Sequence, residues 1–128
     1  MKTPKRKLKD KLEKVVKSIV KIRDKNICQK CQKKVEGANC HASHVIPVSR
    51  DGRLAYDPIN LKVLCFHCHI NWWHKHPIES GQWYLSKFPK RYAVIEQIHL
   101  ENKNKGSISI NWYQEQYKFY REMLDTMV

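Results

Sequence analysis

Two pairs of cysteines with identical spacing constrain the fold of this 128-residue chain more than any other feature. Cys28 and Cys31 form the first pair, and Cys65 and Cys68 form the second, with 33 residues between the pairs. Thiolates three positions apart can reach one metal ion from a tight turn, and a second such pair completes the tetrahedral shell that zinc prefers. We therefore expect a structural Zn²⁺ site that joins the two ends of the intervening segment and leaves no coordination position open for chemistry. The alternative is four buried cysteines without metal.

The overall composition restricts the classes of protein to which such a chain can belong. The chain carries 25 Lys and Arg against 12 Asp and Glu, a net charge of +13, and it has five cysteines in all. An odd number of cysteines favours a reducing compartment, and no apolar run approaches the roughly 18 residues that a membrane span needs. We therefore expect a soluble, cytoplasmic protein without a membrane partner. Its basic charge favours a polyanion, most commonly nucleic acid, as the partner.

We expect a single domain of the α+β class, built from residues 1–25, 26–76 and 77–128. Residues 1–25 predict one amphipathic helix, with Thr3 as the N-cap and Pro4 as the first helical residue. Its apolar face repeats at three- and four-residue steps and consists of Leu8, Leu12, Val15, Val16, Ile19 and Ile22. The other face holds most of the charge, because this segment has eleven basic and three acidic residues, a net +8.

Residues 26–76 predict two strands followed by a helix. The first strand covers residues 41–48 and ends near Pro47, because proline cannot donate to a sheet. The second strand covers residues 62–65, and a helix follows over residues 66–75. Cys40 has no partner at metal spacing and is interpreted as a buried apolar side chain.

Residues 77–128 predict three helices that pack on the core. The first covers residues 79–88, the second residues 89–101, and the third begins after Ser109, which can cap it. Aromatic and apolar residues at helical spacing form the expected buried face of the third helix, namely Tyr113, Tyr117, Tyr120, Leu124 and Met127. The net charge of this segment is only +1, which favours packing over binding.

The residues between and beside the cysteine pairs carry the most specific functional signal. Three strings follow one another in the chain: Ser43-His44-Val45-Ile46-Pro47, then Asn60-Leu61-Lys62-Val63-Leu64-Cys65, then Cys68-His69. Their order of His, Asn and His, with the Leu-Cys-x-x-Cys-His ending, resembles the zinc-clamped form of the HNH nuclease motif, of the ββα-metal class. The stretch from His41 to His44 with Arg50, and the stretch from Gly81 to Tyr84, also resemble phage recombination endonucleases of the NinG (Rap) type.

The resemblance to HNH nucleases implies a chemical role for three residues. His44 would be the general base that takes a proton from the attacking water, since an ordinary histidine pKa of about 6.5 leaves it mostly neutral at physiological pH. Asn60 would brace the loop that follows the first strand and so help fix the ring of His44. His69 would hold one catalytic divalent cation, Mg²⁺, Mn²⁺, Ni²⁺ or Zn²⁺, to polarise the scissile phosphate.

One position departs from the pattern of that family. Most members have an aspartate that ligates the metal immediately before the base histidine, and here the residue is Ser43, a poor ligand. His41 lies two residues earlier, on the same side of an extended strand, and could supply the missing donor. Two imidazoles would favour zinc, nickel, manganese or cobalt more than an all-oxygen magnesium site does. The remaining histidines are interpreted as surface or core residues: His67, His74, His76 and His99.

These features together predict a metal-dependent DNA endonuclease of the HNH family. The candidate phosphate contacts are Arg50, Arg53, Lys5, Arg6 and Lys7. The narrower resemblance suggests branched or recombination intermediates as DNA substrates and, if a phage encodes the chain, the host cytoplasm as its location. One alternative is a zinc-clamped nucleic-acid-binding module without catalysis, and another is a basic N-terminal helix that docks on a protein. The oligomeric state stays open, although symmetric cutting of a junction would require a dimer.

Overall fold

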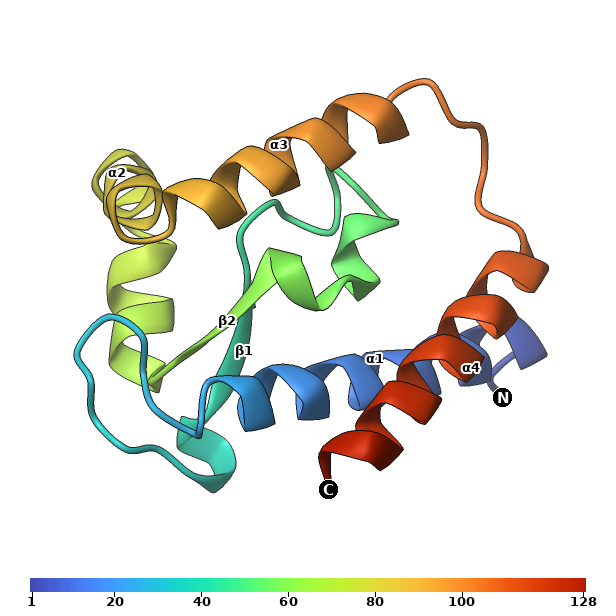
Figure 1. Cartoon of the computed structure of the whole chain (residues 1–128), viewed down its shortest axis with the longest axis horizontal. Coiled ribbons are helices and arrows are strands. Elements are labelled where there is room, and N and C mark those ends of the chain that lie inside the picture. Colours follow the sequence, from blue (N-terminus) through green and yellow to red (C-terminus); the bar gives the residue numbers. More distant parts are fainter.

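A two-stranded antiparallel sheet lies between helices that come from both ends of the chain (Figure 1). The computed structural model describes residues 1–128. The helices are α1 (Pro4–Arg23), α2 (Pro77–Lys87), α3 (Pro89–Asn102) and α4 (Ile110–Met127), and the strands are β1 (His41–His44) and β2 (Leu61–Leu64). This combination confirms the α+β class. None of the helices combines the length and the apolar character that crossing a membrane would require.

Helix α1 begins where the sequence predicts. The Thr3 hydroxyl accepts the backbone N–H of Arg6 at 3.2 Å, and Pro4 occupies the first turn, where its missing N–H costs nothing. The apolar face differs from the prediction at its end, because Val20 is buried whereas Ile22 is 37% exposed. Val20 follows Val16 by four residues and so continues the face that contacts the core, while the helix ends one residue after Ile22.

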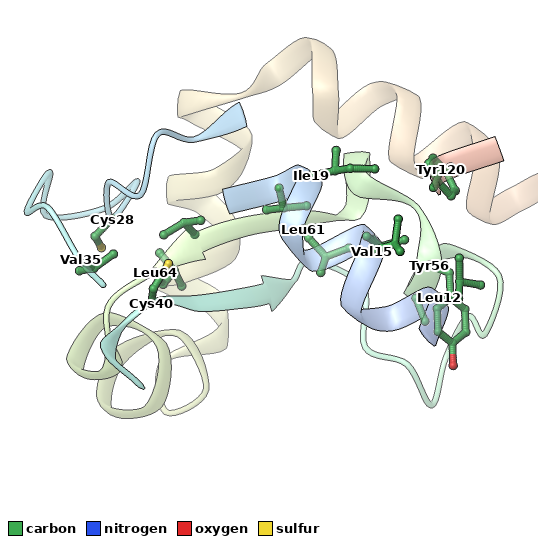
Figure 2. Close-up of a cluster of buried hydrophobic side chains, with 14 of the residues drawn as sticks. Leu12, Val15, Ile19, Cys28, Val35, Cys40, Tyr56, Leu61, Leu64 and Tyr120 are labelled. Atoms are coloured by element: carbon green, nitrogen blue, oxygen red, sulfur yellow. The ribbon is translucent and has the colours of Figure 1, made fainter. Parts of the chain in front are cut away.

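The main core forms where α1 crosses the sheet and packs against α4. Figure 2 shows Leu12, Val15 and Ile19 of α1 with Leu61 of β2 and Tyr120 of α4 in one cluster of buried side chains. Ser109 caps α4 by accepting the N–H of Trp112 at 3.1 Å, as predicted. Residues from the two termini therefore close the same core, and Figure 1 shows α3 on the opposite side of the sheet.

Both strands are short. In the antiparallel register, His41 pairs with Leu64 and His44 pairs with Leu61. The predicted first strand, residues 41–48, is therefore too long by four residues, and the second begins and ends one residue earlier than predicted. Beyond His44 the chain leaves the sheet because the next backbone groups bond to Asn60 instead of to a strand.

The helix predicted after β2 is present, but it is wound more widely than an α-helix. This segment, η4 (His67–Trp73), is a π-helix, and the N–H of His74 donates to the carbonyl of His69, five residues earlier, at 3.2 Å. Trp73 packs edge-on against Trp83 of α2, with the ring centres 6.4 Å apart. The neighbouring Trp72 also packs on Trp83, with the ring centres 5.4 Å apart, so both tryptophans join η4 to α2.

A second, smaller core lies between the loop after β1 and helices α2 and α3. Leu54, Tyr84 and Ile95 are buried together there, with Tyr92 and Ile98 partly buried against them. Helices α2 and α3 meet at Pro89, which ends the first and begins the second, as predicted. This core supports the loop between the strands from the side opposite to α1.

Candidate metal centre and active site

The four paired cysteines converge at one point. Their sulfur atoms all lie within 4.8 Å of one another, although the pairs are far apart in the chain. Cys28 and Cys31 lie on the tight turn after α1, whereas Cys65 follows β2 and Cys68 is the second residue of η4. Three of the four are buried, and Cys31 is exposed.

The surroundings of Cys28 suit a thiolate, whereas burial raises the pKa of Cys31 and of Cys68. The backbone N–H of Cys68 points to the sulfur of Cys65 at 3.4 Å. Burial raises the pKa of Cys28, but backbone N–H groups of Cys31, Cys65 and Lys30 oppose it, and the net result is a lowered pKa of about 7. Donors aimed at sulfur stabilise the charged form that zinc requires, so the cluster fits a structural Zn²⁺ site.

His44 lies at the end of β1 with one ring nitrogen already engaged. Its Nε2 lies 3.0 Å from the carbonyl oxygen of Ala55, and because a carbonyl only accepts, Nε2 carries the hydrogen and Nδ1 carries the free lone pair. Burial, followed by the charges of Lys17 and Lys62, lowers the pKa of His44 below its ordinary value. A half-buried, neutral imidazole with a fixed tautomer is suited to accept a proton.

Asn60 is fully buried (0% exposed) and joins three backbone groups of the loop that begins after His44. Its Oδ1 accepts the N–H of Ile46 at 2.9 Å, and its Nδ2 donates to the carbonyls of Ile46 at 3.0 Å and Leu54 at 3.2 Å. Leu54 is the neighbour of Ala55, whose carbonyl holds His44. The amide of Asn60 therefore fixes both sides of the turn that orients the His44 ring.

His41 and His69 face one another across β1 and η4. Their Nδ1 atoms are 2.9 Å apart, and the Nε2 of His41 donates to the carbonyl of Ala38, also at 2.9 Å. The Nδ1 of His41 therefore carries a lone pair directed toward His69. Two nitrogens bound to adjacent positions of one ion lie about 3 Å apart, so the spacing of this pair fits a shared divalent ion.

His74 is exposed, which confirms it as a surface histidine, and its ring also lies beside this pair. Its Nε2 lies 3.0 Å from the Nε2 of His69. Burial, followed by the charges of His74 and His41, lowers the pKa of His69 to about 4. The sequence did not indicate this contact, because a five-residue separation places two side chains on different faces of an ordinary α-helix, and only the π-winding of η4 brings them together.

Ser43, which replaces the usual aspartate, is fully buried and bonded to a buried lysine. The Nζ of Lys62 donates to the Ser43 hydroxyl at 2.9 Å and to the His44 carbonyl at 3.1 Å. It also lies 3.1 Å from the ring centre of Trp73. Burial lowers the pKa of Lys62 well below its ordinary value, and these contacts offset part of the cost of burying the amine. Sequence reasoning counted Lys62 as one of the basic charges and missed this arrangement.

The predicted DNA contacts differ in how freely they face solvent. Arg50 is exposed, while Arg53 donates to the carbonyl of Gly106 and lies over the ring of Trp112. On α1, Lys5 lies 5.7 Å from the ring centre of Tyr113, and Arg6 is 3.9 Å from the carboxylate of Asp10. Lys7 is exposed and forms no ion pair.

Comparison with known families agrees with this geometry. A family model described as HNH endonuclease matches residues 28–72, about a third of the chain. Neither a curated protein nor a solved structure matches the chain. Residues 28–72 are thus similar to HNH endonuclease domains, and this range contains the four cysteines that could hold a metal ion. The matched range includes the candidate site residues His41, His44, Asn60 and His69, whereas His74 lies two residues beyond it.

Proposed function

We propose that the protein is a metal-dependent DNA endonuclease that hydrolyses phosphodiester bonds. The observation that carries this proposal is the arrangement of His44, whose Nε2 is held by the Ala55 carbonyl while its Nδ1 is free. Together with the match to HNH endonucleases, this arrangement supports His44 as the group that takes a proton from the attacking water. Its lowered pKa keeps the base form available at neutral pH.

Asn60 would act on His44 indirectly, by holding the loop that carries Ala55. His69 and His41 would hold the catalytic ion through their paired Nδ1 atoms. When bound, a divalent ion would polarise the scissile phosphate and stabilise the leaving oxygen. His74 would accept a hydrogen bond from the Nε2 of His69, which fixes the ring and leaves its Nδ1 as the donor atom. With two imidazole donors, the site favours manganese, nickel or zinc over magnesium.

Two finer parts of the proposal come from the sequence resemblance alone. The likeness to NinG (Rap) endonucleases favours branched DNA as the substrate, and HNH nucleases usually leave a 5′-phosphate and a 3′-hydroxyl. A four-way junction is therefore the substrate of choice beside a plasmid, and its cleavage relative to a matched linear duplex measures the preference directly.

The test compares wild type with His44→Ala in Mg²⁺, Mn²⁺, Ni²⁺ and Zn²⁺, on supercoiled plasmid and on the junction. Wild type should cut in at least one metal, and His44→Ala should reduce the rate by about 10²–10⁴-fold, as expected for loss of a general base. His76→Ala is the matched control, because the His76 side chain is exposed and forms no hydrogen bond. Uncut DNA in every metal, or equal cutting by His44→Ala, would contradict the proposed mechanism.

The alternative is a zinc-clamped module that binds nucleic acid without cutting it. The observation that favours it concerns Ser43, which stands where a metal-ligating aspartate is usual. The Ser43 hydroxyl accepts a hydrogen bond from Lys62. Such a module would bind the junction with unchanged affinity after substitution of His44 or His69. Neither the wild type nor these variants would cut it.

A further inference from the structure

A basic pocket lies where the loop after β1 meets the linker between α3 and α4. Its volume is about 150 Å³, and its four cationic residues are Arg50, Arg53, Lys103 and Lys105. The first two precede the second two by about fifty residues, so only the fold brings them together. None of the four forms an ion pair with an acidic side chain.

The single carboxylate of the pocket is engaged elsewhere. Asp51 is buried and accepts the backbone N–H groups of Arg53 at 3.1 Å and Leu54 at 2.9 Å. It also accepts from the side chains of His99 at 2.8 Å and Asn102 at 3.2 Å. With these four donors around it, Asp51 shapes the turn and leaves the four cations without a neutralising partner. The pocket therefore has a strong excess of positive charge.

The pocket walls are held together by close contacts between the two segments. A guanidinium nitrogen of Arg53 donates to the Gly106 carbonyl at 3.2 Å, and its guanidinium carbon lies 5.6 Å from the ring centre of Trp112. The Ile108 side chain packs closely on the turn, because a Cβ atom at Gly52 would lie only 3.2 Å from its Cδ1 atom. Arg53 is thus positioned in advance, which reduces the entropy lost when an anion binds.

The pocket adjoins a cleft whose lining reaches His74. It shares Arg50 and His99 with this cleft, which has a volume of about 480 Å³. That cleft is lined by Val45 and Ile46, directly after His44, and by His74. A DNA strand that follows this cleft past His74 would therefore reach the basic pocket at Arg50, beyond the one carboxylate of the cleft, that of Glu96.

We propose that this pocket binds one backbone phosphate of the DNA, displaced along the strand from the phosphate at His44. The inference rests on the proposed function for its substrate and extends the binding surface to the linker between α3 and α4. Guanidinium groups bind phosphate oxygens in a bidentate manner, and the two lysines add charge without a geometric requirement. Lys103 and Lys105 therefore contribute to binding, although the low net charge of residues 77–128 had suggested packing alone.

The experiment measures DNA affinity in EDTA, so that binding is separated from cleavage. Lys103→Gln/Lys105→Gln is compared with Lys90→Gln/Lys118→Gln, which removes the same charge at exposed positions outside the pocket. Affinity for a fluorescent duplex and a four-way junction is recorded over a series of KCl concentrations. For loss of one phosphate contact, the slope of log affinity against log salt should fall by about 0.9 in the pocket variant and stay near the wild-type value in the control.

Equal slopes and affinities in the two variants would overturn the inference. A second result would also overturn the inference: the wild-type pocket binds inorganic phosphate saturably at constant ionic strength, but the pocket variant keeps its affinity for DNA. The pocket would then bind free phosphate and not the DNA backbone. If wild type cuts no DNA in any metal while the slopes differ as expected, the nuclease proposal fails and the phosphate site stands. Circular dichroism verifies that both variants fold, which is expected because all four lysines are exposed.

Discussion

At the scale of single residues, the candidate site depends on two buried side chains that hold the backbone around His44 in place. Asn60 forms three hydrogen bonds to the loop after β1, and Lys62 bonds to Ser43 and to the carbonyl of His44. Neither side chain is accessible to DNA, since both are fully buried. Their contribution is to reduce the conformational freedom of His44, the residue proposed to act on water.

Substitution of Asn60 by alanine should lower the free energy of unfolding by about 2–5 kcal/mol. The change leaves the N–H and the carbonyl of Ile46 without partners, and each unsatisfied buried group costs about 1–3 kcal/mol before the structure relaxes. The Leu54 carbonyl loses one of two donors and keeps the N–H of Asp57 at 3.1 Å. Chemical denaturation measures the loss. Asn104→Ala is the control, because Asn104 is exposed and should change stability by less than about 0.5 kcal/mol. Similar stability of the two variants would mean that Asn60 does not brace the loop.

The pH dependence of cleavage should reflect the lowered pKa of His44. A general base acts in its neutral form, so the rate should rise with pH and level off, with a midpoint below the ordinary histidine value of about 6.5. Because the charge of Lys17 helps to lower this pKa, Lys17→Gln should move the midpoint upward. Single-turnover rates at saturating metal are the measurement, since metal binding itself varies with pH. A midpoint above 6.5 in wild type would contradict the assignment.

At the scale of elements, the sequence predicted best where a local signal specifies the structure. Thr3 and Ser109 cap their helices, and Pro89 separates α2 from α3, because caps and prolines act through neighbouring backbone groups. The end of β1 and the π-helical winding of η4 could not be predicted from such local signals, because both depend on contacts that the neighbouring sequence does not specify. β1 ends because Asn60, distant in the chain, takes its next hydrogen bonds, and His74 reaches His69 only in the wider helix.

The four-cysteine cluster joins the turn after α1 to the end of β2, and the N–H of Gln29 also donates to the carbonyl of Val63 at 2.9 Å. Cys65→Ser should abolish stoichiometric zinc binding and unfold the turn that carries Cys28 and Cys31, because structural zinc contributes folding energy directly. Zinc content and hydrogen exchange of residues 27–40 are the measurements. Cys40→Ala is the matched control, since Cys40 is also buried but lies outside the four-sulfur cluster and should retain one zinc. Full zinc content and unchanged exchange in Cys65→Ser would contradict a zinc role for this cluster.

At the scale of the whole molecule, the net charge of +13 is divided by the fold into engaged and free cations. Lys2, just before α1, and Arg6 pair with Asp10, and Lys17 pairs with Glu13. Three other lysines of α1 are exposed and form no ion pairs, and they repeat at steps of four and three residues. We name them the lysine row: Lys7, Lys11 and Lys14. It lies away from the apolar face of α1. Of the three DNA contacts predicted on this helix, Lys5, Arg6 and Lys7, only Lys7 belongs to the lysine row.

Lys7→Gln/Lys11→Gln should therefore weaken DNA binding in a salt-dependent way. If each lysine neutralises its own phosphate, the slope of log affinity against log salt should flatten by up to about 2, because each contact releases about 0.9 counterion. Lys90→Gln/Lys118→Gln controls for the loss of two charges. The competing view, that α1 docks on a protein, predicts slopes equal to wild type in both variants. The lysine row and the basic pocket belong to different segments, so combining their substitutions should give additive changes in the slope of log affinity against log salt. A combined change no larger than that of one variant alone would mean that a single DNA strand cannot reach both surfaces.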